Sequence, residues 1–265
     1  MSRPIYDGRI NIVHTDSILE DVSLQKSTWD LNRREQNSLN LKHICADNGI
    51  NAEGNLAIVG FSQDNNSFRR IYAPDKDILV NKKDGNVIIT DSSVALMGWA
   101  ADCLLIAFMT EDQQVVAIAH ASVISLNSGV LDSVVDAFKS YGYDPFDITA
   151  YMGTCIGVDS YEYDYERAVQ DFSNFKDFII MKGESEKVYI DLYGAAKSRL
   201  RELGFAEMID IFAECERDTM TAKDEQGEFM FPSYRRDVVV EDGKVKHING
   251  QYGLIIQKAI LAGEI

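Results

Sequence analysis

The chain has 265 residues, 46% of them hydrophobic, and a formal net charge of −16. This apolar content supports a sizeable core and excludes general disorder. Because 42 acidic residues face only 26 basic ones, nucleic acids and anionic membranes are not expected partners, since both bind basic surfaces. Four cysteines without a Cys-x-x-Cys pair exclude a disulfide scaffold and a structural zinc knot. With no apolar segment of signal-peptide or membrane-span length, we expect a cytoplasmic protein with free thiols.

The predicted elements alternate between strands and helices along the chain. In order, we predict a polar loop at 30–55, strands at 86–90, 101–109 and 115–121, a helix from Val130 that stops at Gly142, a strand at 148–152, helices at 165–175 and 192–203, a strand at 208–213, a polar loop at 214–228 and a strand at 238–240. The runs at 101–109 and 115–121 are nearly all apolar, which is typical of strands buried on both faces. Because the strands and helices interleave without a strict βαβ order, we predict a mixed α/β (α+β) protein, with one domain over 1–265.

The hairpin predicted at 101–121 brings a cysteine and a histidine onto one face. A turn centred on 111–112 pairs Cys103 directly with His120, with Cβ atoms about 4.5–5.5 Å apart. A turn centred one residue later pairs His120 with residue 105 and leaves Cys103 diagonal to it on the same face. A register of the other parity would place the two side chains on opposite faces.

A thiol beside an imidazole is compatible with three roles. The pair can bind a soft metal through its sulfur and nitrogen atoms. The imidazole can instead deprotonate the thiol and make it a nucleophile. The two side chains can also be ordinary core residues, because buried free cysteines are common. The residues alone leave these alternatives open.

Five short motifs, found in the same order, resemble those of a known family. They are Ser38-Leu39-Asn40-Leu41; Ala101-Asp102-Cys103; His120-Ala121; Gly153-Thr154-Cys155-Ile156 followed by Tyr161-Glu162; and Cys215 followed by Ser233-Tyr234-Arg235-Arg236-Asp237. These are similar to the SLNL, ADC, HAGWRG, GPCI…YE and CT…SYRRD motifs of the YfiH or multicopper polyphenol oxidase (laccase-like) family, also called the peptidoglycan editing factor family. The resemblance spreads from residue 38 to residue 237 and so covers most of the chain.

The resemblance implies a fold and an activity. The fold is a single domain of mixed β-sheets flanked by helices in a layered α-β-β-α sandwich. The activity is that of a purine nucleoside enzyme, by phosphorolysis of adenosine, inosine or methylthioadenosine or by deamination of adenosine, at a zinc or copper site. The partners are then a small nucleoside and phosphate, and we expect a monomer or small homo-oligomer. Laccase chemistry needs many histidines, and the chain has four.

The chain departs from the family pattern at the implied metal site. Tyr72 stands where the first metal-binding histidine of an NQVHG motif is expected, and the residues after His120-Ala121 lack the glycines, Trp and Arg of HAGWRG. Cys103 and His120 alone leave a catalytic zinc one protein ligand short. His43 is the other nearby candidate ligand. We therefore expect zinc or copper to be bound weakly or lost.

Two alternatives to the nucleoside enzyme stay open for this edited site. One is a metal-free cysteine hydrolase or amidase, with Cys103 as nucleophile and His120 as base. The other is a non-catalytic relative that keeps the fold to bind a ligand.

Further side chains of the matched motifs are candidates for substrate binding. Arg235 and Arg236 carry planar guanidinium groups suited to phosphate or carboxylate. Asn40, Tyr72 and Tyr161 are expected to line the site or orient a ligand.

The remaining polar and cysteine positions of these motifs are expected to be structural. Asp102 is flanked by apolar residues and is expected to point away from the face of Cys103. We interpret it as a hydrogen-bond acceptor rather than a catalytic base. Cys155 and Cys215 are expected to pack in the core.

Overall fold

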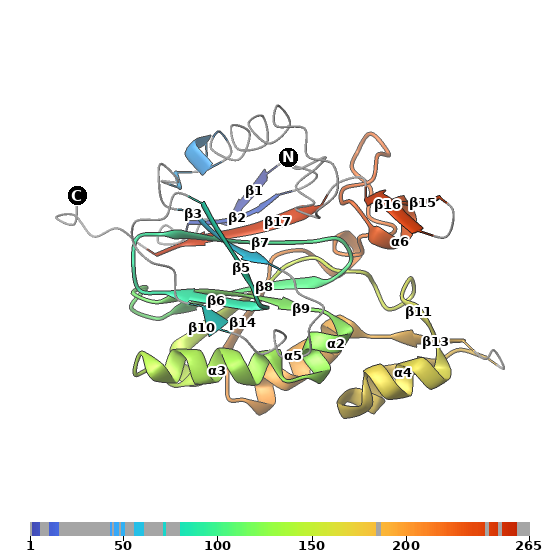
Figure 1. Ribbon diagram of the computed structural model, residues 1–265, viewed down its shortest axis with the longest axis horizontal. Helices are drawn as coiled ribbons and strands as arrows, with labels where there is room; N and C mark the ends of the chain where they lie inside the picture. Colours follow the sequence, from blue (N-terminus) through green and yellow to red (C-terminus); the bar gives the residue numbers. More distant parts are fainter. Residues whose placement is uncertain are drawn as a thin grey trace.

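Two stacked six-stranded sheets form the centre of the molecule (Figure 1). The computed structural model describes residues 2–5, 11–15, 43, 45–47, 49–50, 56–60, 71–72, 80–183, 187–241, 244–248 and 251–258. The first sheet has the strand order β1 (Ser2–Ile5), β2 (Asn11–Thr15), β17 (Tyr252–Gln257), β7 (Ala95–Ala100), β3 (Leu56–Gly60) and β5 (Val80–Asp84). The second has the order β14 (Glu207–Asp210), β10 (Ile148–Met152), β8 (Leu104–Thr110), β9 (Val116–Ala121), β6 (Val87–Thr90) and β4 (Ile71–Tyr72).

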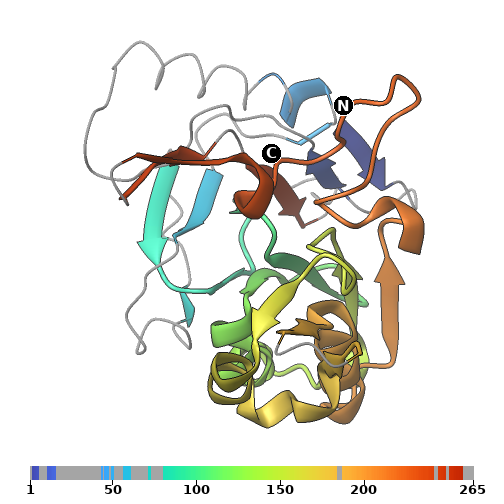
Figure 2. The ribbon, with the colours of Figure 1, turned by 90° about the vertical axis from the view of Figure 1, so that its right-hand side faces the viewer.

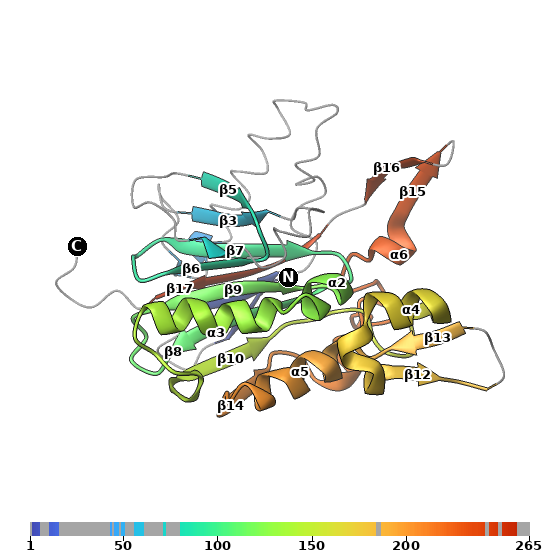
Figure 3. The ribbon, with the colours of Figure 1, turned by 60° about the horizontal axis from the view of Figure 1, so that its bottom comes forward.

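Helices cover the face of the second sheet that points away from the first (Figures 1 and 3). They are α2 (Val123–Asn127), α3 (Val130–Ser140) and α5 (Leu192–Glu202), with the 3-10 turns η2 (Pro145–Asp147) and η3 (Ser173–Phe178) nearby, whereas α4 (Tyr165–Asp171) packs on a small sheet at one end of this layer. This small sheet has the order β11 (Glu162–Asp164), β13 (Lys187–Ile190) and β12 (Ile179–Met181). The 3-10 turn η4 (Glu214–Glu216), the short helix α6 (Tyr234–Asp237) and the ribbon of β15 (Val238–Glu241) and β16 (Lys244–Ile248) complete the described elements.

Two hydrophobic cores explain the long apolar runs of the sequence. Alternate residues of β8 and β9 face either the helices or the first sheet. Leu104, Ile106 and Phe108 pack in the core under the helices, whereas Leu105 and Ile118 pack in the core between the two sheets. Strands covered on both faces need no polar positions, which confirms the prediction made for these two runs.

The mixed α+β architecture and most predicted elements are confirmed. The apolar stripe of α3 is buried as predicted, and the chain turns at Gly142 with a positive φ of 88°. The single helix predicted over 165–175 is wrong in its second half, because α4 ends at Asp171 and a 3-10 turn follows. Several strands were not predicted, among them β7 and β17, which lie next to each other in the first sheet. No helix among the described residues is long and apolar enough to cross a membrane.

Candidate functional site

The Ala101–Cys103 segment carries the chain from one sheet to the other. It follows the end of β7 in the first sheet and precedes β8 in the second. Asp102 has φ of 81°, a left-handed conformation that Asp and Asn adopt more readily than most residues. Two hydrogen bonds hold the turn. Ile156 N–H donates to the Asp102 carbonyl over 2.9 Å, and the Tyr252 hydroxyl of β17 donates to the Cys103 carbonyl.

Cys103 and His120 lie at the same end of the β8–β9 pair. The observed register pairs Leu105 with His120 and Leu104 with Ala121. The directly opposed pairing of Cys103 and His120 is therefore wrong, and the register with a turn one residue later is confirmed. Cys103 precedes the first residue of β8 and packs against the core between the sheets, as Leu105 does.

His120 is buried and oriented by an amide side chain. Its Nδ1 lies 2.7 Å from Asn86 Oδ1, and its backbone N–H donates to the Asn86 carbonyl over 2.8 Å. Because an amide oxygen only accepts, this contact places the ring proton on Nδ1 and the lone pair on Nε2. Burial lowers the pKa of His120 to about 3, so the ring is uncharged at neutral pH.

Cys103 is a protonated thiol in this setting. Burial, and secondarily the negative charge of Asp102, raise its pKa to about 12. Both effects disfavour the thiolate. Cys45 and Cys155 are fully buried thiols, and burial raises the pKa of each. These environments agree with a packing role for Cys155.

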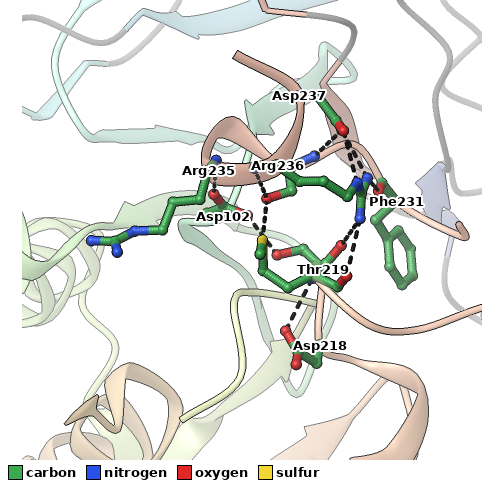
Figure 4. A network of polar contacts seen from close by, with 9 residues as sticks. Asp102, Asp218, Thr219, Phe231, Arg235, Arg236 and Asp237 are labelled. Atoms are coloured by element: carbon green, nitrogen blue, oxygen red, sulfur yellow. Dashed lines mark hydrogen bonds and ion pairs between the residues drawn. The ribbon is translucent and has the colours of Figure 1, made fainter. Parts of the chain in front are cut away.

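The carboxylate of Asp102 joins the sheet-to-sheet turn to the helix that carries the arginine pair. Its Oδ1 accepts a hydrogen bond from the Thr219 hydroxyl over 2.6 Å, and its Oδ2 accepts one from the Arg235 backbone N–H over 2.8 Å. Asp102 is buried. The interpretation of this side chain as a structural acceptor fits these contacts. Figure 4 shows the connection, and Figure 2 looks onto this end of the molecule, with α6 in red above the yellow segment that contains β11.

The two arginines of α6 are used in different ways. The Arg236 guanidinium pairs with Asp237 over 2.7 Å and donates to the carbonyls of Thr219 and Phe231 over 2.8 and 2.7 Å. Its Cζ also lies 3.8 Å from the centroid of the Phe229 ring. These protein contacts occupy the donors that an anion would need, so the group is placed to hold the chain together.

Arg235 instead extends outward over two aromatic rings. Its Cζ lies 4.7 Å from the Tyr161 ring centroid and 5.7 Å from that of Tyr163. One guanidinium nitrogen, Nη1, donates to the Glu162 carbonyl over 2.6 Å. The residue is exposed, and in Figure 4 its side chain points away from the Arg236 cluster. No hydrogen bond from its Nε or Nη2 to another described residue is found.

Tyr161 brings this exposed arginine close to the cysteine turn. Burial raises its pKa well above the usual value, with a further contribution from nearby Cys103. The chain links these groups, because the Ile156 N–H bonds the Asp102 carbonyl and Tyr161, five residues on, lies beneath the Arg235 guanidinium. Tyr161 and Arg235, two of the sequence-predicted residues, are therefore in contact, next to the segment that bonds the Cys103 turn.

The described residues do not assemble a complete metal site. No group of three or more His, Cys, Asp or Glu side chains that could hold a metal is found among them. His43 is exposed in a helical stretch, and Asn40 lies outside the described residues. Tyr72 of β4 pairs with Ile88 of β6, and Ile88 pairs with Ile118 of β9. The strand β6 therefore lies between the backbone of Tyr72 and β9, and Tyr72 is level with Ile118, two residues before His120. The donors described here do not fit a three-ligand zinc or copper centre.

Three residues at this site were missed by sequence reasoning. Asn86 orients His120, Tyr252 holds the Cys103 carbonyl, and Thr219 bonds Asp102. Asn86 had one usable signal, since a polar residue directly precedes the apolar strand at 87–90. Tyr252 and Thr219 lie more than a hundred residues from their partners, and no local pattern indicates such contacts.

Comparison with known proteins gives one family. The family described as multi-copper polyphenol oxidoreductase laccase matches residues 30–247. An Escherichia coli protein named purine nucleoside phosphorylase YfiH is 29% identical over 212 residues, covering 76% of this chain and 82% of that protein.

Solved structures share the fold at low sequence identity. A Neisseria meningitidis protein of family DUF152 matches with a TM-score of 0.69 at 19% identity, covering 98% of this chain and 99% of that one. YfiH from Bacillus licheniformis matches with a TM-score of 0.67 at 19% identity, over 97% and 88% of the two chains. YlmD from Geobacillus stearothermophilus matches with a TM-score of 0.69 at 18% identity, over 94% and 91%. The chain therefore belongs to the multi-copper polyphenol oxidoreductase laccase family, which includes YfiH.

Proposed function

We propose that this protein is a purine nucleoside phosphorylase and that Cys103, His120, Tyr161 and Arg235 belong to its site. The single observation that carries the proposal is the exposed guanidinium of Arg235, which lies on the Tyr161 ring and whose one hydrogen bond among the described residues goes to the Glu162 carbonyl. A planar cation of this kind binds phosphate through two parallel hydrogen bonds. The name of the Escherichia coli relative supports the same substrate class.

The reaction requires an anion site beside a site for the nucleoside. Phosphate attacks C1′ of the sugar, the bond from C1′ to the purine nitrogen breaks, and the base leaves with that electron pair and takes up a proton. The products are free base and sugar 1-phosphate. Arg235 would hold the attacking phosphate and offset its charge, and Tyr161 beneath it would keep the guanidinium plane in position.

His120 is suited to accept a proton or hydrogen bond rather than to donate one as an imidazolium. Its pKa is lowered to about 3 by burial, so the neutral ring with its lone pair on Nε2 is the form present at neutral pH.

The alternative of a metal-free cysteine hydrolase has less support in the described geometry. Such an enzyme needs a thiolate at neutral pH, whereas burial raises the pKa of Cys103 to about 12. We therefore place Cys103 beside the substrate as a neutral thiol.

The test is a product assay with metal-analysed protein. Adenosine, inosine and methylthioadenosine are incubated with and without phosphate, and free base and sugar 1-phosphate are measured. We expect phosphate-dependent release of base, and an increase of about tenfold or more in the KM for phosphate in Arg235→Ala, the size of a lost charge-assisted contact. Arg235→Lys should recover part of the loss. Absence of base release with all three nucleosides, or release that is independent of phosphate, would overturn the proposal.

A further inference from the structure

Asp102 makes contacts with two parts of the candidate site through different atoms. Its backbone, with φ of 81°, forms the turn that presents Cys103 at the start of β8. Its side chain reaches α6, where Oδ2 accepts the backbone N–H of Arg235 over 2.8 Å.

The short helix that carries Arg235 does not itself supply a partner for the Arg235 backbone N–H. It spans only Tyr234–Asp237, and its cap, Ser233, accepts the N–H of Arg236 over 3.2 Å, one residue beyond Arg235. An N–H in the first turn of a helix has no partner within that helix. The Asp102 carboxylate supplies the partner for Arg235 with a charge-assisted hydrogen bond, which is shorter and stronger than a neutral one.

We infer that Asp102 is a positioning residue that sets the place of Arg235 relative to Cys103 and Tyr161, and so determines the affinity for phosphate. The inference rests on the proposed function, because it concerns the same anion site. Asp102 does not touch the anion. It acts through the backbone of Arg235, while Arg236 anchors the other side of α6 to the 219–231 segment.

The chemistry of Asp102 allows a clean set of variants. Glycine accepts a positive φ without strain, so Asp102→Gly removes the carboxylate and leaves the turn conformation allowed. Asparagine tolerates the same conformation and keeps one neutral acceptor oxygen, so Asp102→Asn is the conservative variant. Thr219→Val is the matched control, because it removes the hydrogen bond to Oδ1 and leaves that between Oδ2 and Arg235 in place.

The experiment measures steady-state kinetics with phosphate and nucleoside varied separately, together with thermal unfolding. We expect Asp102→Gly to raise the KM for phosphate about tenfold and the KM for nucleoside less than about twofold, the effect of losing one charge-assisted contact. Asp102→Asn should raise the KM for phosphate less than about threefold. Thr219→Val should lower the melting temperature and leave the KM for phosphate within about twofold.

A double-mutant cycle distinguishes an effect of Asp102 through Arg235 from a general destabilisation of the fold. If Asp102 acts through Arg235, Asp102→Gly adds less than about a twofold change to the KM for phosphate in an Arg235→Ala background. Full additivity, or an equal effect of Thr219→Val, would overturn the inference. Direct titration of inorganic phosphate into the wild type and Arg235→Ala tests the proposed function separately from the role of Asp102. Binding to the wild type but not to Arg235→Ala supports the anion site, independently of the result for Asp102. Binding to neither protein would overturn the proposed function.

Discussion

Arg235 and Arg236 are consecutive in the sequence, yet only the guanidinium of Arg236 is enclosed by the protein. Arg236 is bonded to Asp237 and to the carbonyls of Thr219 and Phe231, whereas Arg235 is exposed over Tyr161. The first arrangement stabilises the fold, and the second leaves donors for a ligand. This contrast gives a direct pair of variants.

Replacing Arg236 should destabilise the protein, and replacing Arg235 should not. Arg236→Ala leaves part-buried carbonyls and the Asp237 carboxylate without their donor, which costs about 2–4 kcal/mol of unfolding free energy. Arg235→Ala removes an exposed side chain and should cost about 0.5 kcal/mol. Urea unfolding followed by circular dichroism measures both. Equal losses for the two variants would contradict the assignment of their roles.

The hydrogen bond between Asn86 and His120 should be visible as a coupled stability effect. Asn86→Ala leaves a buried ring N–H without this acceptor, which costs about 1–3 kcal/mol. In a His120→Phe background the same substitution should cost clearly less, because no ring N–H remains to be satisfied. Chemical denaturation of the four proteins gives the coupling energy. A coupling energy of zero would mean that the 2.7 Å contact does not stabilise the folded state.

The same end of the molecule illustrates what a sequence can and cannot predict. Alternation along 101–121 predicted that Cys103 and His120 share a face, because strand periodicity is a local property. The turn position, which decides which residues are directly opposite, depends on contacts that the local pattern does not contain. The tip is fixed by Thr110, whose hydroxyl bonds Asp112 and the N–H groups of Gln114 and Val115.

The candidate site was predictable only where it lies in contiguous motifs. Cys103, Tyr161 and Arg235 belong to such motifs, and Tyr161 and Arg235 are in contact. The different uses of Arg235 and Arg236 could not be predicted, because they depend on which carbonyls face each guanidinium, those of Thr219 and Phe231 for Arg236 and that of Glu162 for Arg235. Strand β7 was missed for a related reason, since Gly98 interrupts its apolar run and glycine lowers the strand propensity of any local pattern.

Cys103 should react slowly with alkylating agents at neutral pH. Its pKa is raised, by burial first and by the Asp102 charge second, to about 12, so at pH 7 only about one molecule in 10⁵ carries the thiolate. In protein dialysed against a chelator, the iodoacetamide rate should lie well below that of a free thiol and rise with pH up to about 12. Mass spectrometry identifies the site, with Cys103→Ser as the control. Stoichiometric alkylation near pH 7 would instead favour the cysteine hydrolase.

Asp218 should make stability depend on pH in the acidic range. Burial alone would raise its pKa, but hydrogen bonds from the Ser160 hydroxyl over 2.6 Å and the Gly157 N–H over 2.8 Å, with two more from Met220 and Thr221, outweigh burial and lower it below the usual 3.8. A folded pKa below the unfolded one contributes stability that is present above the unfolded value and lost as pH falls through the folded value.

The comparison with Asp218→Asn isolates this contribution. The wild type should exceed the variant by about 1–3 kcal/mol near pH 7, the cost of leaving several donors unsatisfied. Below about pH 4 the difference should shrink as the carboxylate takes up a proton. Urea unfolding at a series of pH values measures it. A difference that stays constant down to the acid limit would show that the carboxylate charge is not involved.

Gly98 lets the two sheets approach each other. A Cβ at this position in β7 would lie 2.8 Å from Ile118 Cγ2 and 3.1 Å from a methyl carbon of Leu105, both in the second sheet. A Gly→Ala change in an unstrained strand usually stabilises a protein by about 0.4–1 kcal/mol through the unfolded state. Here the added methyl must displace buried side chains, so we expect Gly98→Ala to lower the unfolding free energy by about 1–3 kcal/mol.

A second substitution tests whether Ile118 is the cause. Ile118→Ala removes the clashing Cγ2 and leaves a cavity, so Gly98→Ala should cost less unfolding free energy in that background than in the wild type. The double variant should therefore lose less than the sum of the two single losses. Urea titrations of the four proteins, with unchanged dependence on denaturant concentration, give the coupling energy. Additive losses would mean that the sheets have room at Gly98. Because Ile118 precedes His120 by two residues on the same face of β9, a measured clash would also predict lower phosphorolysis in Gly98→Ala, recovered in part in the double variant.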